Sequence, residues 1–375
     1  MEPRDEAATG ATARPESPVR ALPGSFTLVM ATGILSVAAF GAGVPWLSWV
    51  LLAAASLAYA ILAAVLLVAV WRGPRALARS LLDSSTAVES FALVAATSVL
   101  GLRALLAGWD GVAAGAWVAA LAMLAVVGYA VGILLSLRPA PTVAAARGGW
   151  LLAVVGTQSV AVLGAALAPL RWHRGLGLVS LCLWLLGLAL YGAILGAIAL
   201  RALLHGARLA DCTPDYWITM GALAITCLAG TRLLSAGDAD GLLHLERPLV
   251  AGLTIGAWAG ATAWCPWLAV TQLWRAASVP GALGYGQGQW WAMVFPLGMY
   301  GEASRDLGHE LGLPPLAALS ASFLVMGVAA WTVTAAGLGR SLWAAARAQR
   351  GSCPSRGARP GAAVGTDPEV APEQN

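Results

Sequence analysis

The stretch from Leu51 to Trp71 reads LLAAASLAYAILAAVLLVAVW and contains no charged residue. About 20 consecutive apolar residues are what an α-helix needs to cross the hydrocarbon core of a bilayer. Similar runs fill most of the 375-residue chain, which is 59% hydrophobic and only 11% charged. A soluble domain of this length has no core large enough to bury so many apolar side chains. The sequence therefore predicts a membrane protein whose main partner is the lipid bilayer.

The apolar runs predict an all-α fold with ten spanning helices. They lie at about residues 23–43, 46–71, 88–108, 113–137, 150–170, 175–204, 216–235, 247–275, 289–311 and 315–347. The runs lack the alternation of barrel strands, and inside lipid a helix satisfies its own backbone hydrogen bonds. We expect one transport domain over residues 21–347, with polar, disordered cytoplasmic tails at 1–20 and 348–375. No cleaved signal peptide is predicted, because no short apolar core with a small-residue cleavage site follows the first tail.

The arginines predict the orientation in the membrane. All 22 cationic residues are arginine, which together with the Ala and Gly content is typical of a GC-rich bacterial genome. One side of the membrane takes only six of them, and the other takes all the rest; the six are Arg103, Arg171, Arg174, Arg232, Arg247 and Arg305. By the positive-inside rule both termini are cytoplasmic, in a multi-pass protein of the bacterial inner membrane. The arginines form no patch, so no nucleic-acid partner is expected.

No catalytic, cofactor or metal motif is present. The five cysteines form no CxxC pair, and the four histidines never stand at i, i+4 spacing. HExxH, GxSxG, the Walker loop and the dinucleotide fingerprint are all absent. We therefore expect a protein that is not an enzyme and needs no cofactor.

The odd-numbered spans carry more polar and helix-kinking residues than the even-numbered ones. They begin about every 60 to 75 residues, which predicts five helical hairpins around a central pore lined by the odd helices. The candidate lining residues are Phe26, Thr32, Thr97, Thr157, Gln158 and Thr219. A second interpretation stays open, in which Ser, Thr and Gly only allow the helices to pack closely.

The ninth span contains the sequence WWAMVFPLGMY over residues 290–300. Pro296 removes one backbone hydrogen bond and, with Gly298, predicts a kink in this helix. A kink turns a neighbouring side chain inward, and the ring of Phe295 would then close a narrow conduit. The alternative is a phenylalanine packed against lipid or another helix.

Four segments of the chain resemble the tellurite-resistance/dicarboxylate transporter family, which includes the plant slow anion channels, yeast malate permeases and sulfite efflux proteins. They are residues 23–36 (PGSFTLVMATGILS), 154–159 (VVGTQS), 215–222 (DYWITMGA) and the ninth-span sequence just quoted. The resemblance implies ten helices in five hairpins, a pore lined by the odd helices and a homotrimer of separate pores. It also implies a phenylalanine plug on the ninth helix, at the position of Phe295.

One departure from the family pattern lies just after this plug. Glu302 is followed by Arg305 and Asp306, and a carboxylate in an anion pathway repels its cargo unless it is protonated or paired. Arg305 stands at i+3 and can pair with Glu302. Glu302 and Glu89 are therefore candidate proton-coupling groups, or else an interfacial ion-paired residue and a helix-dipole carboxylate, respectively.

Arg103 and Arg232 stand near the outer ends of two odd helices, where they would attract anions to the mouth or act only as topology residues. The sequence thus predicts transport of small anions, with C4-dicarboxylate, tellurite-type oxyanion, sulfite, halide and nitrate all open. The alternative is a proton-coupled dicarboxylate carrier on the same scaffold.

Overall fold

The computed structural model describes residues 18–73, 84–137, 145–170, 173–206, 211–240, 247–279 and 290–351. All regular secondary structure within these ranges is helical. Most of both predicted tails lies outside the described residues, although the first helix already begins at Pro18. The all-α prediction is confirmed.

Ten long helices match the ten predicted spans. They are α1 (Pro18–Gly41), α2 (Pro45–Arg72), α5 (Phe91–Leu106), α6 (Asp110–Leu137), α7 (Leu152–Leu167), α8 (His173–His205), α9 (Ile218–Asp240), α10 (Arg247–Ser278), α11 (Trp291–Leu311) and α12 (Pro315–Gly351). Most ends lie within a few residues of those expected, and the largest differences come where polar tails or connections extend a helix.

Three inner spans begin with a separate helical segment that the sequence did not indicate. The short helix α4 (Ser84–Glu89) precedes α5, and the 3-10 turns η1 (Gly148–Leu151) and η3 (Pro214–Trp217) precede α7 and α9. Pro214 starts η3 because the first turn of a helix needs no backbone N–H donor there. Apolar periodicity cannot detect such breaks, because the apolar pattern continues through them.

Within the described residues, nine helices are long and apolar enough to cross a membrane. The tenth, α11, has 21 residues, and at about 1.5 Å per residue it is long enough as well. Glu302, Arg305 and Asp306 lower its apolar content. Because α11 packs between two spanning helices, α1 and α9, we describe it as the tenth span.

Burial divides the helices into two groups. The spans of α1, α5, α7 and α9 are 72%, 78%, 89% and 83% buried inside the protein, whereas those of α2, α6, α8, α10 and α12 are only 17–22% buried. Most side chains of α11 are buried as well. The predicted arrangement, with odd-numbered spans inside and even-numbered spans outside, is therefore confirmed.

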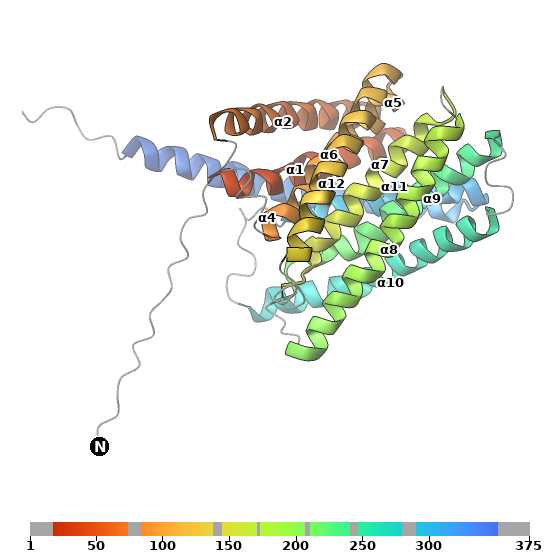
Figure 1. Cartoon of the computed structure of the whole chain (residues 1–375). Coiled ribbons are helices and arrows are strands. Elements are labelled where there is room, and N and C mark those ends of the chain that lie inside the picture. The colour runs from red at the N-terminus through yellow and green to blue at the C-terminus, as the bar shows by residue number, and fades with distance from the viewer. Residues whose placement is uncertain are drawn as a thin grey trace, which may run out of the picture.

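The five buried helices form a closed ring. Contacts run from α1 to α5, α5 to α7, α7 to α9, α9 to α11, and α11 back to α1. Each outer helix packs against the inner helix that precedes it in the chain, which gives five hairpins. Figure 1 shows α2 and α10 on opposite sides of the bundle, with α7 and α11 between them.

The outer helices present large apolar side chains to their surroundings. Leu67, Tyr129 and Leu203 are 69%, 76% and 83% exposed. An apolar groove also runs between α6 and α8, where Leu124, Leu186 and other apolar residues line it. Lipid is the solvent that such a surface requires.

Glycine allows the inner helices to approach closely at two places on α11. A Cβ atom at Gly221 of α9 would lie 2.8 Å from Cγ of Pro296. A Cβ atom at Gly298 would lie 3.0 Å from Leu35 and 3.1 Å from Ile34, both on α1. Small residues at helix contacts are typical of membrane bundles. These contacts hold α11 between its two neighbours in the ring.

Candidate functional site

Phe295 is fully buried in the first half of α11, with 0% of its surface exposed. Contacts made by the residues that follow Phe295 fix the rotation of α11 about its own axis. Pro296 contacts α9 at Gly221, and Gly298 contacts α1 at Ile34 and Leu35. The helix continues through Pro296, which lies inside α11. Packing of Phe295 against lipid is therefore excluded.

The outward face of α11 is marked by Tyr300 and Gly301. The hydroxyl of Tyr300 lies 2.7 Å from that of Thr262 on α10, and its ring packs on Phe323 of α12. A Cβ atom added at Gly301 would lie 3.2 Å from the backbone oxygen of Ser320 on α12, so the two helices are in close contact here.

Successive residues of an α-helix turn by about 100°, so the face opposite Tyr300 and Gly301 carries Phe295, Met299, Glu302 and Asp306. All four side chains are at most 10% exposed. The ring of Phe295 thus lies on the side of α11 that points away from the outer helices.

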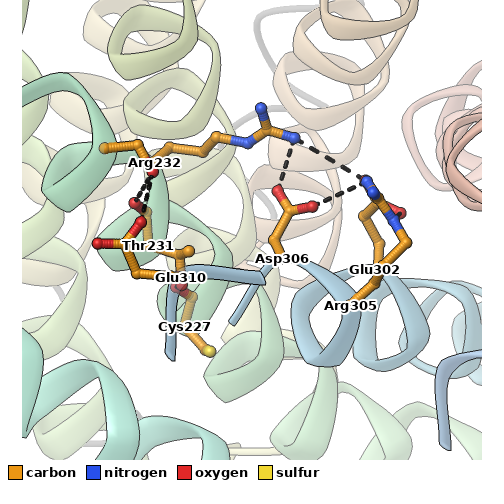
Figure 2. Close-up of polar contacts among 8 residues, drawn as sticks. Cys227, Thr231, Arg232, Glu302, Arg305, Asp306 and Glu310 are labelled. Carbon is orange, nitrogen blue, oxygen red and sulfur yellow. Dashed lines mark hydrogen bonds and ion pairs between the residues drawn. The ribbon is translucent and has the colours of Figure 1, made fainter. Parts of the chain in front are cut away.

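Four charged residues form a cluster further along the bundle. Glu302, Arg305 and Asp306 stand seven to eleven residues after Phe295 on α11, and Arg232 comes from α9. Arg305 Nη2 lies 2.5 Å from Glu302 Oε1 and 2.8 Å from Asp306 Oδ1, and Arg305 Nε donates to Glu302 Oε2 at 3.1 Å. Arg232 Nη2 lies 2.6 Å from Asp306 Oδ2 and 3.9 Å from Glu302 Oε1. Figure 2 shows the Arg232 side chain extending from α9 toward Asp306.

The cluster is electrically balanced, with two carboxylates against two guanidinium groups. The sequence predicted the Glu302–Arg305 pair, and the structure adds Arg232 and Asp306. Glu302 is fully buried, so its charge is tolerated only because these partners surround it. Arg232 is 25% exposed at its side chain and is engaged by carboxylates, so little of its charge is left to attract anions.

Arg103 stands near the end of α5, as its place in the sequence predicted, but its side chain is buried. It is 0% exposed and points from α5 into the α1–α2 hairpin, where its Nε donates to Ser48 Oγ at 2.9 Å. The rings of Phe40 and Trp49 lie 4.7 and 4.9 Å from its guanidinium carbon. The role of Arg103 in attracting anions to a mouth stays a prediction.

Glu89 is placed differently from the expectation. It is the last residue of α4 and not a residue of the first turn of α5. Its carboxylate lies beside Gly24 of α1, where an added Cβ would be 2.7 Å from Oε2. Glu89 therefore lies at the contact between the first and third spans.

Several of the predicted lining residues bond outward, to the outer helices. Thr97 Oγ1 lies 2.8 Å from the hydroxyl of Tyr59 on α2, and Thr32 Oγ1 accepts a 2.9 Å bond from the indole of Trp331 on α12. Gln158 donates to the carbonyl of Trp184 on α8 at 3.1 Å.

The other lining candidates show no such bond to an outer helix. Phe26 packs edge-on against Tyr59. Thr157 and Thr219 bond carbonyls of their own segments, and Thr157 also borders the groove between α6 and α8. The lining role of all six candidates stays a prediction.

The sequence did not predict which residues of the outer helices accept or donate these hydrogen bonds. Tyr59, Trp184 and Trp331 stand in long apolar helices that look like plain lipid-facing spans. The O–H of Tyr59 and the N–H of Trp331 gave a usable signal, because a buried phenol or indole needs a hydrogen-bond partner. Trp184 accepts from Gln158 through its backbone carbonyl, which no side-chain signal marks. Within the described residues, no group of three His, Cys, Asp or Glu side chains is arranged to hold a metal ion.

Comparison with known proteins agrees with this architecture. Residues 20–338 match the SLAC1 family, described as voltage-dependent anion channels. An uncharacterized membrane protein of Mycobacterium tuberculosis is 36% identical over 145 residues, covering 39% of this chain and 73% of that protein. An uncharacterized transporter of Methanocaldococcus jannaschii is 25% identical over 168 residues, covering 44% of this chain and 46% of the transporter. The family match spans all ten helices, and the chain accordingly belongs to the SLAC1 family of anion channels.

Proposed function

We propose that small anions cross the membrane along the axis of the inner ring and that the ring of Phe295 closes this passage. Anion transport across a membrane is the activity that family membership implies. The plug and its position are the further proposal. The observation that carries it is the complete burial of Phe295 on the face of α11 turned away from α10 and α12.

An apolar ring suits the role of a plug. It fills a narrow passage without offering a hydrogen bond or a charge, so a hydrated anion meets a dry barrier there. Movement of one side chain then opens the route without unfolding any helix. The close contacts of Pro296 and Gly298 with the neighbouring helices would keep the backbone fixed while the ring turns.

The direct test is anion flux through proteoliposomes that carry the Phe295→Ala variant. Removing the ring is expected to raise flux about tenfold or more, because the steric barrier disappears while the helix contacts stay. Phe323→Ala is the matched control, since it removes the same ring from α12, where Phe323 packs on Tyr300. Equal flux for wild type and Phe295→Ala, with both proteins folded, would contradict the plug.

The substrate is to be found with a panel of anions in the same assay. Chloride, nitrate, sulfite, tellurite and malate cover the halide, oxyanion and C4-dicarboxylate classes left open by the sequence. Selectivity among them follows from passage radius and local field strength, which no motif in the sequence encodes.

A proton-coupled carrier is the second candidate function, and the complete burial of Glu302 inside the ring is the observation that favours it. An ion-paired structural role is the alternative for this carboxylate, because Arg305 donates two hydrogen bonds to it. Glu302→Gln in proteoliposomes decides between the two. A channel retains at least its wild-type flux in this variant and ignores an imposed pH gradient, whereas a carrier that uses this group loses uptake.

We further propose the bacterial inner membrane as the location, with both chain ends in the cytoplasm and three copies in each assembly. The arginine distribution supports the orientation, and the resemblance supports the trimer. Protease protection of tags at each terminus in oriented vesicles tests the orientation. The mass of the purified protein, corrected for bound detergent, tests the trimer.

A further inference from the structure

Arg103 is a buried cation whose charge has no counter-charge among the described residues. Its side chain is 0% exposed, and only Nε has a hydrogen-bond partner, the Ser48 hydroxyl. Both terminal nitrogens, Nη1 and Nη2, are buried without any partner. A guanidinium carries five N–H donors, so four of them are unused. A buried charge in this state is strongly unfavourable unless an anion is supplied from elsewhere.

Three other arginines show what Arg103 lacks. Arg305 pairs with Glu302 and Asp306, Arg232 pairs with Asp306, and Arg247 pairs with Glu310 at 3.0 Å. All three lie at the same end of the bundle as Arg103. Arg232 and Arg305 stand in the later parts of helices that run in the same direction as α5, and Arg247 begins α10 directly after α9. Arg103 alone in this group forms no ion pair with a described carboxylate.

The Arg103 side chain lies between a hydrogen-bonded serine pair on one side and two aromatic rings on the other. Ser36 and Ser48 bond each other's backbone carbonyls at 2.7 Å, which joins α1 to α2 and orients the Ser48 hydroxyl that accepts from Arg103. The rings of Phe40 and Trp49 cover the guanidinium and are themselves 40% and 47% exposed. Exposed side chains change rotamer within nanoseconds, so these two rings can admit a ligand.

The depth of this pocket is that of a membrane interface. Arg103 stands three residues before the end of α5, about 5 Å along the helix axis. Trp46, Trp49 and Trp109 surround the same end of the hairpins and are 69%, 47% and 50% exposed. Trp49 and Trp109 also contact each other, with ring centroids 6.0 Å apart. Exposed tryptophans of this kind mark the headgroup level of a bilayer.

We propose that Arg103 binds the phosphate of an acidic phospholipid headgroup between α5 and the α1–α2 hairpin. The planar pair of unused NH₂ groups matches two phosphate oxygens, which is the geometry in which arginine binds phosphate most strongly. The aromatic rings supply the apolar walls, and the bilayer supplies the ligand at the right depth. A free oxyanion shares the same chemistry, so the experiment separates the two sources.

The test measures thermal unfolding of the purified protein in detergent, with added phosphatidylglycerol, phosphatidylcholine of the same acyl chains, or inorganic phosphate. Phosphatidylglycerol is expected to raise the unfolding temperature of the wild type, and phosphatidylcholine is not. An equal rise with inorganic phosphate would identify a free oxyanion as the source. No rise with either phosphatidylglycerol or phosphate would overturn the proposal.

Variants locate the effect at Arg103. Arg103→Gln is expected to lose most of the lipid-dependent rise and to retain phosphatidylglycerol roughly tenfold less well in native mass spectrometry. Arg103→Lys keeps the charge without the paired donors and should retain part of the rise. Arg247→Gln is the control, because it removes an arginine from the same end that has its own carboxylate partner. A rise in Arg103→Gln equal to that of wild type would also overturn the proposal.

Discussion

Arg232 of α9 and Asp306 of α11 connect two neighbouring helices of the inner ring, with Nη2 of the arginine 2.6 Å from Oδ2 of the carboxylate. Their side chains are only 25% and 10% exposed, so the pair is shielded from water more than a surface ion pair is. Asp306 also accepts from Arg305, which in turn holds Glu302. The contact between α9 and α11 thus brings two carboxylates and two guanidinium groups together (Figure 2).

Breaking this pair should destabilise the ring. Arg232→Gln leaves the cluster with two carboxylates and one guanidinium, and the expected loss in free energy of unfolding is about 1–3 kcal/mol, between the surface and buried limits. Chemical denaturation in detergent measures it. A double-mutant cycle with Asp306→Asn isolates the pairwise part, and a coupling energy of zero would show that the two side chains do not interact.

The same variant should also lower anion flux. The net negative charge that it leaves near the axis of the ring repels an approaching anion, and the repulsion weakens as salt is added. Flux at low and high ionic strength is the measurement. Glu302→Gln changes the balance in the opposite direction and should raise flux, so a decrease in both variants would contradict this electrostatic account.

Side chains of decreasing volume at residue 295 should open the passage progressively. We expect flux to rise from wild type through Phe295→Leu to Phe295→Ala, because each step removes more of the blocking volume. Phe295→Trp should stay closed. Flux that bears no relation to side-chain volume would argue for a role of Phe295 in packing alone.

Gly221 should tolerate no side chain. The Cβ of Gly221→Ala would lie 2.8 Å from the ring of Pro296, which cannot rotate away, so we expect a loss of about 1–3 kcal/mol in unfolding free energy. Gly196→Ala on α8 is the control, since no atom lies within 4 Å of its added Cβ. Alanine there should be neutral or slightly stabilising because of its higher helix propensity. Thermal unfolding of the two variants compares them directly.

Variants of Thr97 distinguish the two interpretations of the polar residues on inner helices, which are pore lining and helix packing. Thr97→Val removes the bond to Tyr59 and is expected to cost about 1 kcal/mol of stability while leaving the order of anion selectivity unchanged. Tyr59→Phe should have the same effect, since it removes the other partner. A changed selectivity order in Thr97→Val would instead support the lining role predicted from the sequence.

The sequence by itself determined the number of spans, their pairing into hairpins and the division into inner and outer helices. Each of these follows from local composition. A run such as Leu51–Trp71 has few polar side chains, whereas the inner spans contain residues such as Thr32, Gln158 or Glu302, whose polar groups need partners inside the protein. The resemblance further singled out Phe295, whose complete burial is compatible with a plug.

Only the tertiary structure decided where the polar side chains find their partners. Thr32 and Thr97 bond tryptophan and tyrosine of outer helices, Arg232 comes from a different helix to join Glu302 and Asp306, and Arg103 turns into a neighbouring hairpin. Helical periodicity shows which residues share a face, but the partner across that face depends on the rotation and depth of a second helix. Those two quantities are set by packing of the whole bundle, including the close contacts at Gly221 and Gly298, and no single segment of the sequence contains them.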